Sequence, residues 1–228
     1  MAMKLENVVP FGRTLAEYRA MFSLTPEDEK RRILSAADGP ASFNAELRAL
    51  GRNVVSLDPV YCFSPEEIRS RFDAVVDNII RQVTESYHDW VWEFHRSPEE
   101  LRRRRVEALE GFLKDFPEGL QAGRYVTGSL PVLPFEDDRF DLVLCSHFLF
   151  LYSLHFDAEF HLRSMREFLR VGKEVRVFPL LTLAREPSSY LEPVTKALRD
   201  AGHLVTIETV PYEFQRGGNQ MLRVIRKP

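Results

Sequence analysis

The sequence has few of the residues that cross-link small secreted proteins or hold structural metals. Only two cysteines occur among the 228 residues, Cys62 and Cys145, and their separation fits neither a metal knuckle nor a redox pair. No stretch approaches the roughly 20 uninterrupted apolar residues of a membrane span, and the first residues lack the apolar core of a signal peptide. We therefore expect a cytoplasmic protein without disulfides, a bound metal or a membrane-spanning segment.

An excess of positive charge is also lacking. Lys and Arg total 31 against 34 Asp and Glu, which gives a net charge of -3, so no overall basic field would attract nucleic acid. The chain is 44% hydrophobic and contains 17 Phe, enough for one large core or a core with a small helical addition. A small molecule is therefore the expected partner, and nucleic acid is not.

Strand and helix patterns alternate after an N-terminal helical segment at residues 1–31. Strand patterns at 32–37 and 53–58 enclose a helix pattern at 42–50, and such a βαβ unit requires a parallel sheet with a right-handed crossover. Further strands are expected at 124–128, 140–146 and 173–181, helices at 157–169 and 188–201, and hairpin strands at 203–214 and 220–226 joined across 216–219. This order predicts a three-layer α/β domain over 32–228 with one reversed strand.

Residues 64–118 interrupt this alternation. Ser64 and Ser97 are each followed by proline and two acids, which is the chemistry of a helix start, so a long helix is expected after each. The stretch is too short to bury a core alone, and its apolar positions recur at helical spacing. We expect a helical insertion that covers one side of the small-molecule site as a lid. The alternative is an element that only packs the core or joins two copies in a homodimer.

Two stretches of the chain resemble motifs of the class I S-adenosylmethionine (SAM) dependent methyltransferases. Residues 33–47, IleLeuSerAlaAlaAspGlyProAlaSerPheAsnAlaGluLeu, are similar to the first motif, which has an apolar strand, an acid, three alternate glycines and a helix. Residues 133–149, LeuProPheGluAspAspArgPheAspLeuValLeuCysSerHisPheLeu, are similar to the fourth motif, LPFxDxSFDLVxxxxxL. The terminal hairpin is similar to the reversed seventh strand of that family. The resemblance covers residues 32–61 and 124–228.

This resemblance implies a Rossmann-like sheet in the order 3-2-1-4-5-7-6 with the last strand antiparallel. It also implies an enzyme that uses SAM and transfers a methyl group to a small-molecule acceptor. Ser35 replaces the acid of the first motif, and Ala37 and Ala41 replace glycines. These replacements keep an alternative open, a catalytically degenerate protein of the same fold that binds SAM or its demethylated product in a regulatory or structural role. A nicotinamide-dependent oxidoreductase is disfavoured by the missing GxGxxG.

The expected cofactor site begins in the loop after the first strand. Its members are Ala37, Asp38, Gly39 and Pro40, where backbone N–H groups and the positive end of a helix suit the methionine carboxylate. Gly39 is the expected point of closest backbone approach, and Asp38 could replace the missing acid at the methionine amine.

Further cofactor contacts are expected where the second and third strands end. Asp58, with Pro59 beside it, is expected to accept hydrogen bonds from both ribose hydroxyls; the alternative is a turn acid before proline. After the third strand, Ser129 would bond the adenine amine and Leu130 would pack on the ring, unless they form an ordinary loop.

Four more candidates come from the fourth strand and from the N-terminal segment. Ser146 and His147 follow the fourth strand at the edge where ligands bind in such sheets. His147 is the candidate general base, because an imidazole titrates near neutral pH; the alternative is a wall residue bonded to a backbone carbonyl. Arg13 and Tyr18 are expected to lie over the cofactor, Arg13 with its forked donors on a carboxylate, unless Arg13 is a surface residue.

Overall fold

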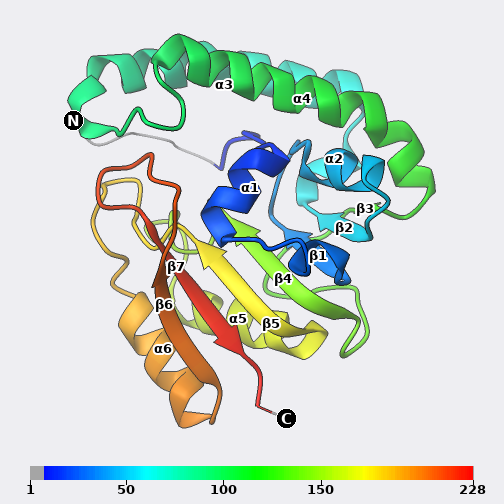
Figure 1. Ribbon diagram of the computed structural model, residues 1–228, viewed down its shortest axis with the longest axis vertical. Coiled ribbons are helices and arrows are strands. Elements are labelled where there is room, and N and C mark those ends of the chain that lie inside the picture. Colours follow the sequence, from blue (N-terminus) through cyan, green and yellow to red (C-terminus); the bar gives the residue numbers. More distant parts are fainter. Residues whose placement is uncertain (1–7, 228) are drawn as a thin grey trace.

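One sheet of seven strands runs through the part of the protein that the structure, a computed structural model, describes, residues 8–227 (Figure 1). Residues 1–7 of the expected N-terminal helical segment lie outside the described residues. In chain order the strands are β1 Ile33–Ala36, β2 Val54–Leu57, β3 Tyr125–Val126, β4 Phe140–Ser146, β5 Gly172–Phe178, β6 Leu204–Thr209 and β7 Gln220–Ile225.

The strand order in the sheet is β3-β2-β1-β4-β5-β7-β6. Strand β7 is antiparallel to both β5 and β6, whereas the pairs formed by β1 to β5 are all parallel. Only the last strand is therefore reversed. The predicted fold, the Rossmann-like sheet of the class I methyltransferases, is confirmed.

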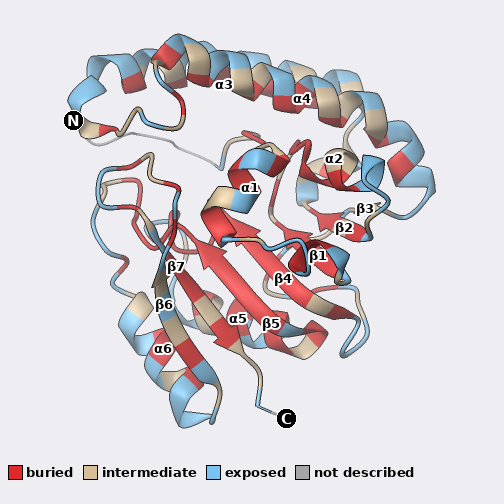
Figure 2. Cartoon of the chain, in the orientation of Figure 1, coloured by how far each residue is buried: buried red, intermediate tan, exposed pale blue. Residues whose placement is uncertain are grey.

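Helices cover both faces of this sheet. The helices are α1 Leu15–Phe22, α2 Phe43–Ala49, α3 Pro65–Glu85, α4 Pro98–Gln121, α5 Ala158–Val171 and α6 Leu191–Asp200. Successive side chains of a strand point to opposite faces. In β4, Leu142 and Leu144 pack with α1 and α2, while Val143 and Cys145 pack with α5 and α6. The three layers that the sequence predicts follow from this alternation, and the strands are the most buried part of the molecule (Figure 2).

The helices α3 and α4 pack side by side across one end of the molecule (Figure 1). Each begins as the sequence predicts, because the hydroxyls of Ser64 and Ser97 accept hydrogen bonds from backbone N–H groups of the first turn. The apolar side chains between and beneath the two helices, many of them aromatic, form a cluster of their own, which also includes Phe11 and Tyr125 from outside the insertion. None of the described helices is long and apolar enough to cross a membrane.

A buried ion pair joins this insertion to the helix before the sheet. Arg105 of α4 donates to both carboxylate oxygens of Glu17 on α1, with Nη1 2.9 Å from Oε2, and also to the carbonyl of Gly12 at 3.0 Å. Both side chains are almost completely buried. Glu17 also closes the capping box of α1 with Thr14. The ion pair therefore fixes the position of α4 relative to the start of α1.

The C-terminal hairpin differs from the sequence prediction. Strand β6 ends at Thr209 rather than at residue 214, because Pro211 has no N–H group to continue the ladder. The chain then leaves the sheet and contacts the insertion, where the hydroxyl of Tyr212 lies 2.8 Å from Nε2 of His95. Residues 210–219 thus connect β6 and β7 and also contact the insertion. The chain does turn near the expected 216–219, where the N–H of Gly218 donates to the carbonyl of Gln215 at 2.7 Å, but the connection between the two strands is longer than predicted.

Candidate functional site

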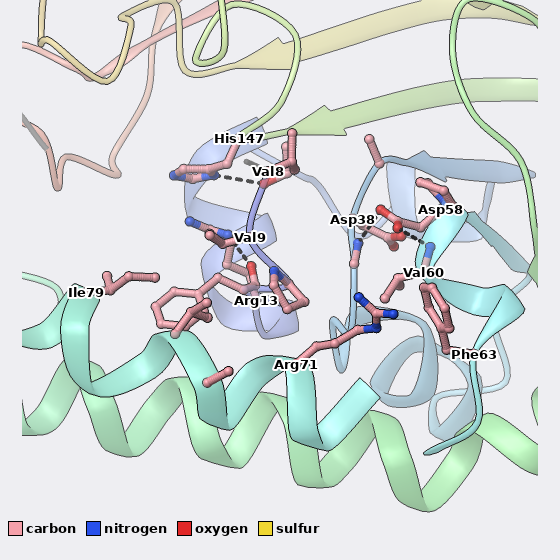
Figure 3. Close-up of a pocket in the computed structure, with 18 of the residues that line it drawn as sticks. Val8, Val9, Arg13, Asp38, Asp58, Val60, Phe63, Arg71, Ile79 and His147 are labelled. Carbon is pink, nitrogen blue, oxygen red and sulfur yellow. Dashed lines mark hydrogen bonds between the residues drawn. The ribbon is translucent and has the colours of Figure 1, made fainter. Parts of the chain in front are cut away.

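A cavity of about 910 Å³ lies between α3 and the carboxyl ends of β1, β2 and β4 (Figure 3). Its walls come from the loop after β1, the 3-10 helix Pro59–Cys62 after β2, the residues after β4, the segment before α1 and one side of α3. This edge of an open parallel sheet is where ligands bind in such folds. A carboxylate pair, Asp38 and Asp58, lies on one side of the cavity, and Arg13 and His147 lie on the other (Figure 3).

The loop after β1 has a backbone shape that exposes it to the cavity. Ala37 and Gly39 have φ angles of 54° and 57°, in the left-handed region that costs a non-glycine residue energy. A side chain on Gly39 would meet only Pro10 Cα, at 3.9 Å, so the space beside this backbone is open. Ala41, which replaces a motif glycine, is buried in the core away from the cavity.

The segment before α1 packs closely against the other side of the loop after β1. A Cβ atom on Gly12 would lie 2.0 Å from the carbonyl oxygen of Pro40, a distance that only glycine allows. Pro40 is buried and does not line the cavity. Its backbone therefore positions the N-terminal segment rather than facing a ligand.

Asp58 ends β2 and holds the two loops of the site together. Its Oδ2 accepts the N–H of Gly39 at 2.9 Å, and its Oδ1 accepts the N–H of Val60 at 2.8 Å. Each oxygen retains a lone pair for a further donor. Burial raises the pKa of Asp58 to about 6, although the two backbone hydrogen bonds lower it. The carboxylate thus caps the turn before Pro59, which was the alternative to a ribose role, and it also faces the cavity. Pro59 lines the cavity too.

Asp38 is the more buried of the two acids. It accepts hydrogen bonds from Ser56 Oγ at 2.8 Å and from the hydroxyl of Tyr61 at 2.7 Å. Burial raises the pKa of Asp38 to about 7, opposed by the hydrogen bond from Tyr61 and reinforced by the charge of Asp58. Two carboxyl groups with raised pKa values at one cavity are typical of a functional site.

Two residues of the N-terminal half are not brought to the cavity. Tyr18 is fully buried, stacks on Phe43 with ring centroids 3.9 Å apart, and has its hydroxyl 3.0 Å from Ser35 Oγ. Tyr18 therefore does not lie over the cavity. Ser35, at the position of the motif acid, is enclosed in the same core.

His147 is held in an unusual backbone conformation with φ 53°. Its N–H donates to the carbonyl of Phe178 at 2.6 Å, and its Nδ1 lies 2.9 Å from Ser146 Oγ. Its Nε2 has no hydrogen-bond partner among residues 8–227, although the side chain faces the cavity. Burial lowers the pKa of His147 well below its usual value, and the charges of Arg13 and Arg105 lower it further. The imidazole is therefore neutral near pH 7.

Arg13 lies beside His147 at the same side of the cavity. One Nη1 donates to the carbonyl of Phe11, but its buried Nε has no partner. Burial and the nearby Arg105 lower the pKa of Arg13 to about 10, so the guanidinium stays charged at neutral pH. A buried N–H without an acceptor is costly, and the charged guanidinium that carries it belongs to a residue that lines the cavity.

The loop after β3 does not reach the cavity. Ser129 is exposed, while Leu130 packs into the core between the sheet and α5, and neither residue lines the cavity. The cavity wall near Asp58 is formed instead by Val60, Phe63 and Arg71, which were not predicted from the sequence. The guanidinium carbon of Arg71 lies 3.7 Å from the ring centroid of Phe63, and Arg71 extends from α3 toward it (Figure 3).

Among the described residues, no group of three or more His, Cys, Asp or Glu side chains is arranged to hold a metal ion. Around the one cavity lie two acids, the guanidinium groups of Arg13 and Arg71, and a neutral imidazole.

Comparison with known proteins identifies one full-length relative. The chain is 31% identical over 226 residues to the uncharacterized protein MJ0045 of Methanocaldococcus jannaschii, and the match covers 99% of both chains. No family model matches the chain.

Solved structures similar to this one include methyltransferases. Magnesium protoporphyrin IX methyltransferase from Synechocystis PCC 6803, with bound SAM, is 14% identical, with 93% of this chain and 78% of that chain covered at a TM-score of 0.49. The PH0226 protein from Pyrococcus horikoshii OT3 is 13% identical, with 93% and 90% covered at a TM-score of 0.48. The assignment of the fold rests on the strand order rather than on these scores.

Proposed function

We propose that this chain, which belongs to the same family as MJ0045 of Methanocaldococcus jannaschii, transfers the methyl group of SAM to a small-molecule acceptor. The chain has the fold of the class I SAM-dependent methyltransferases, and the proposal starts from this fold. The main support is the position of Asp58 at the end of β2. Its carboxylate faces the cavity and keeps free lone pairs. Two ribose hydroxyls are suitable donors for such a carboxylate.

The residues around the cavity fit SAM as a cofactor. Arg13, which lines the cavity and stays charged at neutral pH, would hold the methionine carboxylate. Gly39 leaves the backbone after β1 open to the same group, and Val60 and Phe63 offer an apolar wall to the adenine. A cavity of about 910 Å³ is at the upper end of the range for small-molecule sites, so it has room for an acceptor as well.

SAM, when bound, supplies a methyl group activated by the positive sulfonium. The chain supplies binding, alignment and exclusion of water. Asp58 and Arg13 would fix the two ends of the cofactor, and α3 closes the cavity from above the sheet edge. His147 lies beside Arg13, on the side of the cavity away from Asp58, and has a neutral imidazole suited to accept a proton from an acceptor.

A second candidate is a protein of this fold that binds SAM or its demethylated product without turnover. The enclosed Ser35, paired with Tyr18, favours it because no acid stands at the motif position. Asp38 weighs against it, since this acid lines the cavity three residues later. Radiolabelled SAM with a library of small acceptors separates the two: a labelled product supports the enzyme, and tight binding without product supports the second candidate.

We expect the affinity for SAM to fall as the pH is lowered from about 8 to about 5. Ribose hydroxyls donate to the carboxylate form of Asp58, so its pKa in the complex must lie below the value of about 6 in the free protein. The affinity for SAM is therefore full above the pKa of Asp58 in the free protein, about 6. Below it, the affinity falls by about tenfold per pH unit until the pH reaches the lower pKa in the complex. Calorimetric titration at each pH measures this.

The variant Asp58→Asn is the control for this pH dependence. It should bind SAM weakly at every pH and lose the change centred near pH 6, leaving only the contribution of Asp38, whose pKa is about 7. An affinity of the native protein that stays constant from about pH 8 to about pH 5 would contradict the ribose role of Asp58.

A further inference from the structure

One face of α3 forms a wall of the large cavity. Arg71, Ala74, Val75, Asn78 and Ile79 of this helix line it, and residues three and four apart lie on the same side of a helix. From Arg71 to Ile79 this face is about 12 Å long, because a helix rises about 1.5 Å per residue. It has a charged end at Arg71 and is mostly apolar beyond it, which suits a ligand with one charged group and an apolar body.

Arg71 differs from the other arginines of α3 and α4, because it has no acidic partner among residues 8–227. The arginines of these two helices that do pair with an acid are Arg69, Arg81, Arg102, Arg103, Arg104 and Arg105. Glu67, one turn before Arg71, could reach it, but its Oε2 accepts the backbone N–H of Ser64 at 2.8 Å in the capping box of α3. The guanidinium of Arg71 is therefore free to bind an anion from outside the chain.

Phe63 holds this guanidinium at the cavity. The guanidinium carbon of Arg71 lies over the ring of Phe63, 3.7 Å from its centroid, and the side chain reaches up from α3 into the open side of the cavity (Figure 3). The N–H groups of a guanidinium lie in its plane, so stacking on a ring leaves most of them free. A fork of free donors in a fixed position suits the oxygens of a carboxylate or a phosphate.

Neither the acids of the cavity nor the cofactor supplies this anion. Among the described residues no ion pair joins Arg71 to Asp38 or Asp58, whose oxygens accept hydrogen bonds from other parts of the chain. The one anionic group of SAM is its methionine carboxylate, which the proposed function assigns to Arg13 on the other side of the cavity (Figure 3). An anion at Arg71 therefore comes from the second molecule in the cavity, the acceptor.

We propose that Arg71 determines specificity by binding an anionic group of the methyl acceptor, a carboxylate or a phosphate, while the apolar body of the acceptor lies along Ala74, Val75 and Ile79. This inference rests on the proposed methyltransferase function. It gives the class of the acceptor: a small organic acid or phosphate ester with an apolar body. An uncharged molecule of the same shape lacks the contact with Arg71 and binds more weakly.

The test compares two probes, 4-phenylbutyrate and its amide 4-phenylbutanamide, which have nearly the same size and shape but differ in charge. Each is titrated by calorimetry, at low ionic strength, into the full-length protein saturated with S-adenosylhomocysteine, whose carboxylate occupies Arg13. We expect one molecule of 4-phenylbutyrate to bind per chain, at least about tenfold more tightly than the amide. The phosphate ester 3-phenylpropyl phosphate, titrated in the same way, shows which of the two anionic groups Arg71 prefers.

Arg71→Met and Arg69→Met form a matched pair, because each removes one positive charge from α3. Arg69 pairs with Glu110 of α4, with Nη1 2.8 Å from Oε1, and does not line the cavity. Arg71→Met should bind the two anionic probes no more tightly than the amide, whereas Arg69→Met should keep the native preference. Both variants should bind S-adenosylhomocysteine as tightly as the native protein, which also shows that both are folded.

The proposal is overturned if the native protein binds neither anionic probe more tightly than the amide, if Arg71→Met keeps the preference, or if Arg69→Met loses it too. A loss of affinity for S-adenosylhomocysteine in Arg71→Met alone would place Arg71 at the cofactor and would also overturn it. The titration with S-adenosylhomocysteine keeps these results separate from the proposed function. A native protein that does not bind it loses the cofactor assignment, whereas one that binds it but shows no preference among the probes loses only the assignment of the acceptor.

Discussion

Replacing Arg105 by methionine is expected to lower the free energy of unfolding by about 3–5 kcal/mol. Burial alone would raise the pKa of Glu17, but the charge and hydrogen bonds of Arg105 lower it to about 2. Without Arg105 the carboxylate of Glu17 is left buried and unpaired at the point where α4 meets α1. Urea unfolding followed by circular dichroism measures the loss.

Two variants control this result. Arg103→Met removes an exposed arginine of the same helix that pairs only with exposed or partly exposed glutamates, and should change stability by less than about 1 kcal/mol. The double variant Arg105→Met with Glu17→Gln should recover part of the loss, because no charge is left unpaired. If Arg105→Met costs no more than Arg103→Met, the ion pair does not hold the insertion in place.

Replacing Asp58 by alanine is expected to weaken SAM binding by about 1.5–3 kcal/mol, since two hydrogen bonds from ribose to a carboxylate are lost. The structure adds a second effect, because Asp58 also accepts the N–H groups of Gly39 and Val60. Loss of this cap should lower the free energy of unfolding by about 0.5–2 kcal/mol. Calorimetry gives the first value and thermal unfolding gives the second.

A suitable control is Asp73→Ala, which removes an exposed acid of α3 that does not line the cavity. It should change neither SAM affinity nor stability by more than about 0.5 kcal/mol. An Asp58→Ala protein that is folded and binds SAM with unchanged affinity would remove Asp58 from the cofactor site.

The sheet could be predicted because its sequence signals are local. The apolar stretch of β4 and the caps at Ser64 and Ser97 each depend on a few neighbouring residues. The end of β6 was wrong because the alternating pattern continues past Thr209, while Pro211 breaks the ladder and Tyr212 finds its partner in the insertion. Such partners lie far away in the chain and leave no local pattern.

The site was harder to predict for the same reason. The positions of Asp58 and His147 follow from the rule that strand ends gather at one edge of a parallel sheet, and both residues line the cavity. Tyr18 is enclosed in the core because its partners, Ser35 and Phe43, come from two other elements. The helical spacing along α3 could have indicated Arg71. Ile68 and Phe72 are on the buried face of this helix, and Arg71 lies beside them and lines the cavity.

The most direct test of the central claim is calorimetric titration of the native full-length protein with SAM, S-adenosylhomocysteine and NAD at about pH 8, where Asp58 is ionised. SAM and S-adenosylhomocysteine should each bind with one molecule per chain, and NAD should give no measurable heat. Binding of NAD without binding of SAM would contradict the assignment of the cofactor, and so would the absence of binding by either SAM or S-adenosylhomocysteine.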